Sequence, residues 1–404
     1  MNGTPSLLSR FQAVTELLHV QEQLWRPVPF YLPELPWESR FPALACALRA
    51  LDGPHLAELE SNNAALLAWL AHFLPELEAV TTAQRVPLQP ATTYRYSSSF
   101  HRDIPGRKWQ QIKAFASSMP PPDGPVLEWC AGKGHLGRAL YQRFQTPVTG
   151  LEWNSELCRK GNALSHRHAV DVQLTHCDVL SSTATAHLAR TNHVVALHAC
   201  GDLHRRLVEA ATMQGVSSVY LSPCCYHLSA DPGYRPFSQA GRISGLQLSR
   251  DECRLAVQET VTAAAATAKK RDTKNAWRLG FDRLQRQARK VDEYLPVPPV
   301  SDAALQKGFV EFCRGAAALK KVSLPPGIDW PALEAIGWQR QREVCRMELP
   351  RHAFRRVLEL WLVLDRALFL EESGYKVTVN RFCERAITPR NLLICATKTA
   401  TGAP

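Results

Sequence analysis

The sequence predicts an α/β protein built around a doubly wound, mainly parallel sheet. Between residues 122 and 226, short apolar runs alternate with stretches of helical periodicity, the pattern of strands joined by crossover helices. The length of 404 residues exceeds one minimal core and leaves room for two or three units. A content of 45% hydrophobic and 21% charged residues is that of an ordinary globular protein.

Helices are expected before this core. Apolar residues recur at helical spacing over Leu7–Trp25 and over Leu56–Leu77, and a proline-rich stretch separates the two. Residues 81–107 lack this periodicity and are expected to form an irregular linker. We therefore assign residues 1–95 to an α-helical N-terminal region and residues 96–250 to the core.

Within the core, each strand is expected to be a short apolar run and each helix an amphipathic stretch. The predicted strands are Pro125–Trp129, Val148–Glu152, Val172–His176, His193–His198 and Val219–Ser222. The predicted helices are Leu136–Phe144, Glu156–His168 and Leu203–Gln214. Alternation of this kind indicates parallel pairing of the strands.

After Tyr226 the alternation stops, and helical stretches rich in Lys and Arg follow. Residues 251–370 are therefore predicted to form a helical, basic insertion or cap. Two late strands, Lys376–Asn380 and Leu392–Ala396, are expected within residues 371–404 and would complete a seven-strand sheet.

The sequence carries no targeting or metal-binding pattern. The longest apolar run, Val357–Leu370, contains three charged residues and does not resemble a membrane-spanning helix. The N-terminus lacks the features of a signal peptide, so a cytoplasmic location without a membrane partner is expected. The twelve cysteines include no C-x-x-C pair, and we expect reduced thiols and no metal site.

The net charge of +11 is unevenly distributed along the chain. The first hundred residues carry six Lys/Arg and nine Asp/Glu, so the positive excess belongs to the remainder. A basic catalytic half suits a polyanionic substrate. A generally basic, solvated surface is the alternative.

Three glycines follow the first predicted strand of the core. The run V-L-E-W-C-A-G-K-G-H-L-G places Gly132, Gly134 and Gly137 in a G-x-G-x-x-G pattern between a strand and a helix. Such a turn lets the backbone approach a cofactor and points helix N–H groups at it. The pattern alone also fits a dinucleotide-binding fold.

Acidic residues lie at the ends of three successive strands. Glu128 would repel a pyrophosphate but suits the α-ammonium group of a methionine moiety. Glu152 is placed to hold both ribose hydroxyls, and Asp178 to accept from an adenine amino group. Three such acids suit a cationic sulfonium nucleoside, and Trp153 and Val179 beside them are counted as cofactor-binding residues too.

These motifs resemble those of class I S-adenosyl-L-methionine-dependent methyltransferases. E-W-C-A-G-K-G is similar to their E/D-x-G-x-G-x-G loop, with Cys130 in place of the first glycine. Together with L-H-A-C-G-D-L and P-C-C-Y-H, it resembles a methyltransferase-like family that includes the eukaryotic protein containing a glutathione S-transferase C-terminal domain. A weaker similarity is to the tRNA ribose methyltransferases of the acceptor stem. The resemblance implies a Rossmann-like methyltransferase core with S-adenosyl-L-methionine as its cofactor.

Residues after the fourth strand are expected on the acceptor side of this site. Asp202 is a candidate to receive a proton or to orient the acceptor group, and a helix N-cap is its alternative role. His198 is a candidate base or a cover for the cofactor.

Two adjacent cysteines follow the fifth strand. Cys224 or Cys225 could attack C6 of a pyrimidine and activate C5 for methylation, with Cys200 across the site. Alternatively this turn shapes the target pocket, with Tyr226 stacking on a base and His227 beside it. Buried, inert thiols are the third interpretation.

Basic residues downstream are candidates for binding the substrate. Lys269, Lys270 and Arg271 form a cluster, and Arg390 lies just before the last strand. They could track RNA phosphates or belong to a solvated helix face. The expected function is methylation of a structured RNA, either tRNA or ribosomal RNA. The alternatives are a protein or small-molecule methyltransferase, a non-catalytic RNA-binding protein stabilised by the cofactor, and a dinucleotide oxidoreductase.

Overall fold

The computed structural model describes residues 5–97, 100–258 and 265–399. The chain divides into two compact units, each made of separate stretches of sequence. Unit 1 comprises Met1–Val20, Thr81–Glu259 and Arg355–Pro404, and unit 2 comprises Gln21–Val80 and Thr260–Phe354.

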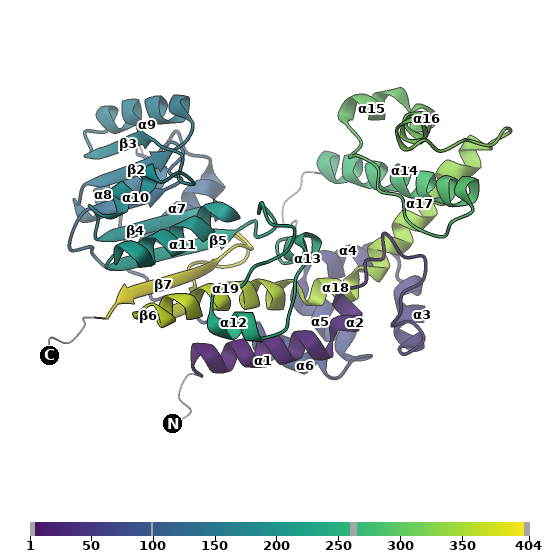
Figure 1. Cartoon of the computed structure of the whole chain (residues 1–404), viewed down its shortest axis with the longest axis horizontal. Helices are drawn as coiled ribbons and strands as arrows, with labels where there is room; N and C mark the ends of the chain where they lie inside the picture. The colour runs from purple at the N-terminus through teal and green to yellow at the C-terminus, as the bar shows by residue number, and fades with distance from the viewer. Residues whose placement is uncertain (1–4, 98–99, 259–264, 400–404) are drawn as a thin grey trace. The chain divides into compact units, whose positions relative to one another are not determined.

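Unit 1 contains a seven-stranded sheet in the order β3-β2-β1-β4-β5-β7-β6 (Figure 1). Strands β1 to β5 pair in parallel, and β7 is antiparallel to both β5 and β6. This sheet confirms the predicted α/β class. The strands are β1 Val126–Trp129, β2 Val148–Glu152, β3 Val172–His176, β4 His193–Cys200, β5 Ser218–Cys224, β6 Tyr375–Arg381 and β7 Leu392–Lys398.

The central strands are buried on both faces, as crossover helices require. Every residue of β1 and β5 is buried, so these strands lack the alternation of buried and exposed residues seen in half-exposed strands. Helices α7 and α8 pack on one face, and α10, α11 and α19 on the other. The helices of unit 1 are α1 Leu7–Val20, α7 Gly106–Ser117, α8 His135–Phe144, α9 Ser155–Arg167, α10 Thr183–Leu188, α11 Asp202–Gln214, α12 Gln239–Ile243, α13 Arg250–Leu255 and α19 Arg355–Glu372.

Helix α19 joins the N-terminal helix α1 to the sheet. Trp361 of α19 packs against Phe11 of α1 with tilted rings whose centroids are 5.3 Å apart, and its indole N–H donates to the Thr15 hydroxyl at 2.9 Å. The segment Val357–Leu370 is therefore a buried helix of the core. No helix in the described residues is long and apolar enough to cross a membrane.

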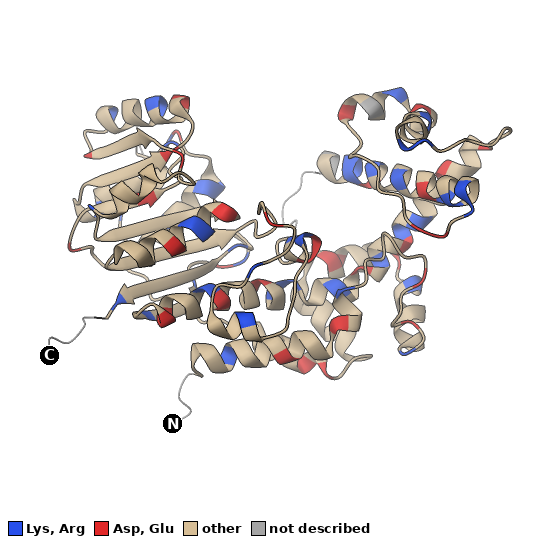
Figure 2. Ribbon diagram, in the orientation of Figure 1, with Lys and Arg blue, Asp and Glu red and all other residues tan. Residues whose placement is uncertain are grey.

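Unit 2 is all-helical in its described part. Helices α14 and α17 cross closely, because a Cβ atom on Gly337 would lie 2.3 Å from the carbonyl oxygen of Ala276. Lys and Arg residues are frequent along α14 (Figure 2). The helices are α2 Glu22–Trp25, α3 Pro42–Ala50, α4 Gly53–Ser61, α5 Asn63–Ala71, α14 Ala265–Arg289, α15 Asp302–Lys307, α16 Phe309–Lys320, α17 Trp330–Met347 and α18 Leu349–Ala353, while α6 Leu77–Ala83 spans both units.

Several element boundaries differ from those expected. The stretch Leu56–Leu77 is broken after α4, because the Asn62 side chain accepts from the amides of Ala64 and Ala65 and starts a new helix there. The two units also cut across the four expected regions. α1 belongs with the sheet rather than with the other N-terminal helices, and α19 belongs with the sheet rather than with the helices of the insertion.

Candidate active site

The loop after β1 is held open by residues in the left-handed region. Cys130, Gly132 and Gly134 have φ values of 59°, 60° and 66°. A side chain on Gly134 would meet Leu174 at 2.9 Å, so this glycine allows the loop to pack against β3. Cys130 is the costly member, since left-handed backbone disfavours a residue with a Cβ by about 1 kcal/mol or more. Cys130, in place of the first glycine of the loop, therefore keeps the turn but makes its backbone conformation less favourable.

Glu128, at the end of β1, is buried with 5% of its surface exposed. Its Oε2 atom accepts from the amide of Gly137 at 2.8 Å, which ties the strand to the first turn of α8. A Cβ atom on Gly137 would lie 2.7 Å from that oxygen, so glycine is required there. Burial raises the pKa of Glu128 to about 7, although the hydrogen bond from Gly137 opposes the shift.

Glu152, at the end of β2, has both carboxylate oxygens oriented by backbone amides. Oε2 accepts from Gly132 at 2.9 Å, and Oε1 accepts from Asn154 at 2.9 Å. The carboxylate therefore fixes the glycine loop against the next strand. Trp153, directly beside it, is 73% exposed and presents an open aromatic face. An acid and an exposed ring at this place can hold a ribose and its base.

The third predicted acid, Asp178, lies beyond the end of β3. It is exposed, and its Oδ1 atom accepts from the amide of Leu180 at 3.0 Å. Val179 beside it is buried, with 4% exposure. Because β1, β2 and β3 are parallel, the structure brings Glu128, Glu152 and Asp178 to the same edge of the sheet.

His198 occupies a distorted part of β4. Its φ is 63°, and the pairing of β4 with β5 shifts register between Leu197 and Cys200. The Nε2 atom donates to the side-chain oxygen of Gln111 in α7 at 3.0 Å. The Nδ1 atom then carries the lone pair, and it is buried without a hydrogen-bond partner among the described residues. Burial lowers the pKa of His198 to about 4, so the ring is neutral at pH 7.

Gln111 is a site residue that sequence reasoning missed. It lies in α7, before the first strand of the sheet, and only the fold places that helix over the strand ends. Its side-chain nitrogen donates to the carbonyl of Ile387 at 3.3 Å, in the loop between β6 and β7. Lys108, one turn earlier, acts electrostatically on both Glu128 and His198. Helix α7 therefore connects the cofactor side of the site to the last loop of the sheet.

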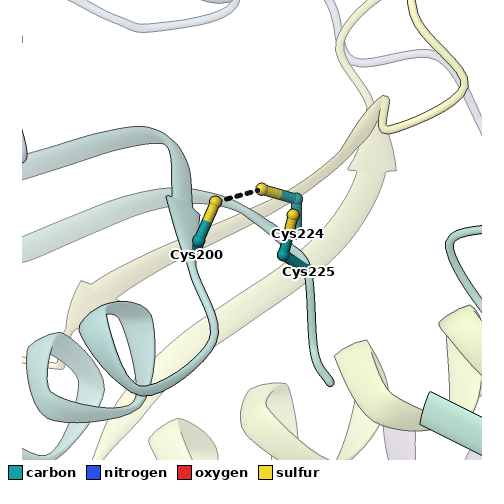
Figure 3. A group of neighbouring side chains, drawn as sticks. All are labelled: Cys200, Cys224 and Cys225. Atoms are coloured by element: carbon teal, nitrogen blue, oxygen red, sulfur yellow. Dashed lines mark hydrogen bonds between the residues drawn. The ribbon is translucent and has the colours of Figure 1, made fainter. Parts of the chain in front are cut away.

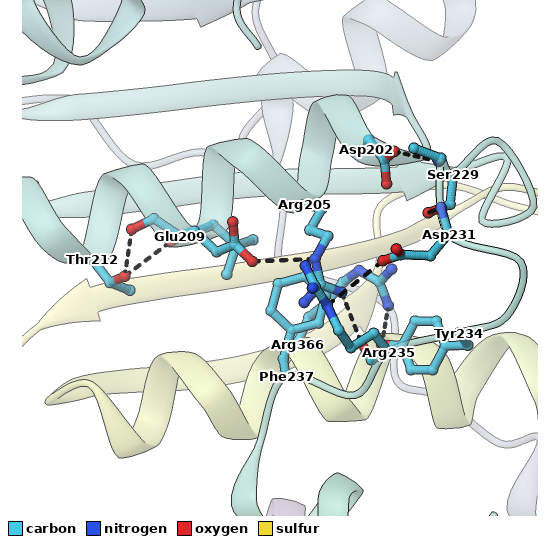
Figure 4. Close-up of polar contacts among 12 residues, drawn as sticks. Asp202, Arg205, Glu209, Thr212, Ser229, Asp231, Tyr234, Arg235, Phe237 and Arg366 are labelled. Carbon is cyan, nitrogen blue, oxygen red and sulfur yellow. Dashed lines mark hydrogen bonds and ion pairs between the residues drawn. The ribbon is translucent and has the colours of Figure 1, made fainter. Parts of the chain in front are cut away.

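Asp202 begins α11, but Gly201 is the N-cap, so the expected capping role is wrong. The carboxylate instead accepts from the amide of Ala230 at 2.7 Å and holds the loop that follows β5 (Figure 4). A Cβ atom on Gly201 would lie 1.7 Å from the carbonyl oxygen of Leu228, and its φ is 54°. Only glycine allows this loop to close against β4.

Three thiols meet where β4 and β5 end (Figure 3). The Sγ atoms of Cys200 and Cys224 are 3.4 Å apart, and those of Cys200, Cys224 and Cys225 all lie within 4.8 Å of one another. Hydrogen bonding from Cys200 and Cys224 lowers the pKa of Cys225 and thereby favours its thiolate. The pKa of Cys224 is raised, first by its hydrogen bonds to the other two thiols.

Tyr226 and His227 follow this cluster. Tyr226 is 3% exposed, its ring packs edge-on against His204, and the guanidinium of Arg366 lies 5.0 Å from its centroid. The ring belongs to the core and offers no face to a base, contrary to the expected stacking role. His227 is half-buried, and burial lowers its pKa.

The expected basic residues belong to two different units. Lys269, Lys270 and Arg271 lie on α14 in unit 2, where Lys270 pairs with Asp302 at 3.1 Å. Arg390 lies in unit 1, donates to the carbonyl of Val257, and acts electrostatically on His198 and Cys225. Of the predicted substrate residues, Arg390 is thus the basic one that the fold brings to the strand ends.

Unit 1 also contains a basic cavity that the sequence did not predict. Its volume is about 440 Å³. It lies around the end of β6 and the start of β7, and since β7 runs antiparallel to β5, this is the same sheet edge that holds the acids and thiols. Its lining residues are Gln84, Arg85, Val86, Pro87, Arg356, Arg381, Arg385 and Asn391. These residues come from three segments that are distant in the sequence, so no local motif predicts the cavity.

Comparison with known proteins adds a family match for the part of the chain that carries these residues. Residues 107–231 match a family model described as a methyltransferase domain. A geranyl diphosphate methyltransferase solved with GPP and sinefungin is 13% identical, with 28% of this chain and 44% of that chain covered and a TM-score of 0.23. A plantazolicin methyltransferase solved with a triazolic analogue and SAH is 16% identical, with 41% and 58% covered and a TM-score of 0.22. This chain thus spans less than two thirds of either protein, and similarity at this level does not bear on the substrate.

The family match and the strand order together confirm the enzyme class expected from the sequence. Residues 107–231 lie in an S-adenosyl-L-methionine-dependent methyltransferase domain, which contains the glycine loop, the three acids, His198 and the thiols.

Proposed function

We propose that this protein transfers the methyl group of S-adenosyl-L-methionine to a structured RNA, either tRNA or ribosomal RNA. The basic cavity beside the last loop of the sheet carries this proposal. The cytoplasmic location and the closer resemblance to the family with a glutathione S-transferase C-terminal domain remain predictions.

The cofactor is proposed to lie along the carboxyl ends of β1 to β4. Glu152 would hold the ribose hydroxyls, and Trp153 would cover the base, with Asp178 and Val179 at its edge. Cys130, Gly132 and Gly134 let the backbone approach the methionine part, and Gly137 and Glu128 support that turn from below. The sulfonium group supplies an electrophilic methyl carbon when bound, and the residues around it have only to align an acceptor in line.

His198 is proposed as the group that receives a proton from the acceptor. Its Nδ1 lone pair has no hydrogen-bond partner among the described residues, and the ring is neutral at pH 7. The lowered pKa makes His198 a weak base, so it suits an acceptor group whose proton becomes strongly acidic as the methyl group is transferred. Gln111 fixes the ring through Nε2. Asp202 is engaged with the amide of Ala230 and is proposed to position the loop after β5. Cys224, Cys225 and His227 line the acceptor side.

The cavity favours a polyanionic substrate. Arg85, Arg356, Arg381 and Arg385 all line it, and a volume of about 440 Å³ is large enough for a phosphodiester segment. Arg356 and Arg381 are oriented by Asn391 and the Val86 carbonyl, respectively. Each also pairs with a carboxylate, Glu359 at 2.6 Å and Glu384 at 3.0 Å, so part of their positive charge is offset and Arg85 is the lining arginine chosen for the test. Guanidinium groups match phosphate geometry, and several of them at the edge of a methyl-transfer site suit a nucleic-acid backbone.

Labelled-methyl transfer tests the proposal directly. The purified protein and labelled S-adenosyl-L-methionine are incubated with total RNA from cells that lack the gene, and in parallel with a protein extract and a small-molecule extract. Label in RNA is expected, and digestion to nucleosides then distinguishes base from ribose methylation. Label confined to protein or small molecules would overturn the RNA proposal while leaving the methyltransferase domain unaffected.

A charge reversal tests the cavity itself. Arg85→Glu is expected to reduce RNA binding and to flatten its salt dependence, since one phosphate contact is lost. Arg190→Glu is the matched control, because Arg190 is an exposed arginine of unit 1 that precedes β4 at the opposite edge of the sheet. Equal RNA affinity of the two variants would remove the cavity from the binding surface.

A further inference from the structure

The three-thiol cluster depends on an unusual backbone at the end of β5. Successive side chains of a strand normally point to opposite faces, so two adjacent cysteines cannot share one ligand. Here Cys225 has a φ of 50°, in the left-handed region. This turn breaks the alternation and brings the Cys225 thiol to the same side as Cys224 (Figure 3).

A second distortion brings in the third thiol. The left-handed φ of 63° at His198 and the register shift in β4 place Cys200 directly opposite Cys224 in the sheet. Non-glycine residues in this region are conformationally costly, and two of them occur here. The distortions at His198 and Cys225 both lie within three residues of a thiol. Together they bring close to one another three sulfur atoms that regular strands would keep apart.

We propose that Cys200, Cys224 and Cys225 bind a zinc ion. Zinc–thiolate bonds of about 2.3 Å in tetrahedral geometry place the sulfur atoms about 3.8 Å apart. The observed separation of Cys200 and Cys224 is 3.4 Å, and all three sulfurs lie within 4.8 Å. Shifts of about 1 Å or less, within reach of side-chain rotation, complete the site. Three soft sulfur ligands select zinc over the hard cations magnesium and calcium.

His227 is the candidate for the fourth ligand. It follows Cys225 by two residues, and its Nδ1 atom is buried without a hydrogen-bond partner among the described residues. Its ring nitrogens lie outside the group of ligand atoms within 4.8 Å of one another, so the ring has to turn toward the thiols to bind the ion. Arg390, whose charge acts on both Cys225 and His227, offsets the negative charge that three thiolates and one zinc ion leave behind. Half-buried Cys200 and Cys225 keep the cluster open to an incoming ion.

This proposal stands independently of the RNA substrate and changes the role of the thiols. A thiolate bound to zinc is not free to attack a pyrimidine, so the metal site replaces the nucleophile considered from the sequence. The expectation of no metal site rested on spacing along the chain. It overlooked that Cys200 and Cys224 end neighbouring strands.

Metal analysis of the full-length protein provides the test. After purification under reducing conditions and dialysis against zinc, mass spectrometry of the metal content is expected to give close to one zinc per chain. Cobalt substitution is expected to give the sulfur-to-cobalt charge-transfer absorption that thiolate ligands produce. Cys200→Ser, Cys224→Ser and Cys225→Ser should each lower zinc retention at least tenfold, and His227→Ala should lower it less. Cys253→Ser, a buried thiol of the same unit outside the cluster, is the matched control.

A second measurement needs no variant, in case the substitutions prevent folding. The wild-type protein is treated with an alkylating reagent with and without zinc, and the modified cysteines are mapped by peptide mass spectrometry. Zinc should protect Cys200 and Cys225 and leave exposed Cys46 equally reactive. Failure to retain zinc together with an unchanged alkylation pattern would overturn the proposal, as would a Cys200–Cys224 disulfide that forms whether or not zinc is present.

Discussion

At the scale of single residues, the two glutamates at the ends of β1 and β2 are placed in contrasting surroundings. Both are buried, with 5% and 6% exposure, and each accepts from a glycine amide of the loop or of α8. Glu152 accepts from a backbone amide on each carboxylate oxygen, whereas Glu128 accepts on Oε2 from the amide of Gly137 in α8. Glu152 therefore fixes the glycine loop at the site, whereas the buried carboxylate of Glu128 lowers the stability of the fold when it is charged.

Replacement of Glu128 by Gln is expected to stabilise the cofactor-free protein at high pH. The pKa of Glu128 rises from 4.5 to about 7 on burial. Between these values the folded state binds a proton that the unfolded chain has released, so stability falls as pH rises through this window and stays lower above it. The loss at pH 8 is on the order of 3 kcal/mol. Chemical denaturation should show a gain for Glu128→Gln at pH 8 and little at pH 4.5, and a gain that is independent of pH would contradict this.

Replacement of Glu152 by Ala is expected to weaken cofactor binding about 10- to 100-fold, since hydrogen bonds to a charged group contribute roughly 1.5–3 kcal/mol. Titration calorimetry with S-adenosyl-L-methionine measures this. Glu156→Ala is the control, because Glu156 is exposed on α9 and its carboxylate pairs with Arg159 and Lys160. Unchanged affinity in Glu152→Ala would remove that residue from the cofactor site.

At the scale of secondary-structure elements, the junctions at the carboxyl ends of the strands carry the strain. Left-handed residues follow β1, interrupt β4 and follow β5. Each lets a loop fold back over the sheet edge. Backbone strain of this kind is a cost to the fold that serves the site.

Gly201→Ala tests one such junction, between β4 and α11. The added Cβ would lie 1.7 Å from the Leu228 carbonyl oxygen, so the loop after β5 has to move, at a cost of about 3 kcal/mol or more. Gly245→Ala is the matched control, with a φ of 72° and nothing within 4 Å of the added atom, and should cost about 1 kcal/mol. Thermal unfolding of both variants measures the difference, and equal losses would show that the close contact is not tight.

The strands were predictable from the sequence because short segments with Val and Leu alternate with helical stretches at a regular pitch. Val148–Glu152 and Val172–His176 have the predicted bounds, and β4 extends two residues past His198. The turns that bring the thiols together were not predictable, because no local sequence feature indicates that His198 or Cys225 adopts a left-handed backbone conformation. Gln111 could not be found for a different reason, because its partner lies 87 residues away in the chain.

At the scale of the whole molecule, the division into two units predicts unequal responses to the cofactor. A ligand that binds the folded state at 100 times its Kd stabilises it by about 2.7 kcal/mol. All proposed cofactor residues lie in unit 1. Hydrogen exchange with S-adenosyl-L-methionine should therefore slow in β1 to β4 and remain unchanged in α16 and α17. Equal protection throughout would show that the two units unfold together.

The position of β7 has a consequence for synthesis of the protein. This strand covers the edge of β5, yet it is made after all other strands of the sheet. Until Leu392–Lys398 leaves the ribosome, the fully buried strand Ser218–Cys224 has an open edge, and open apolar edges pair with other chains. A premature stop shortly before Leu392 would leave that edge permanently uncovered. Nascent chains of this protein thus depend on rapid completion of the C-terminus, or on a chaperone, to escape aggregation.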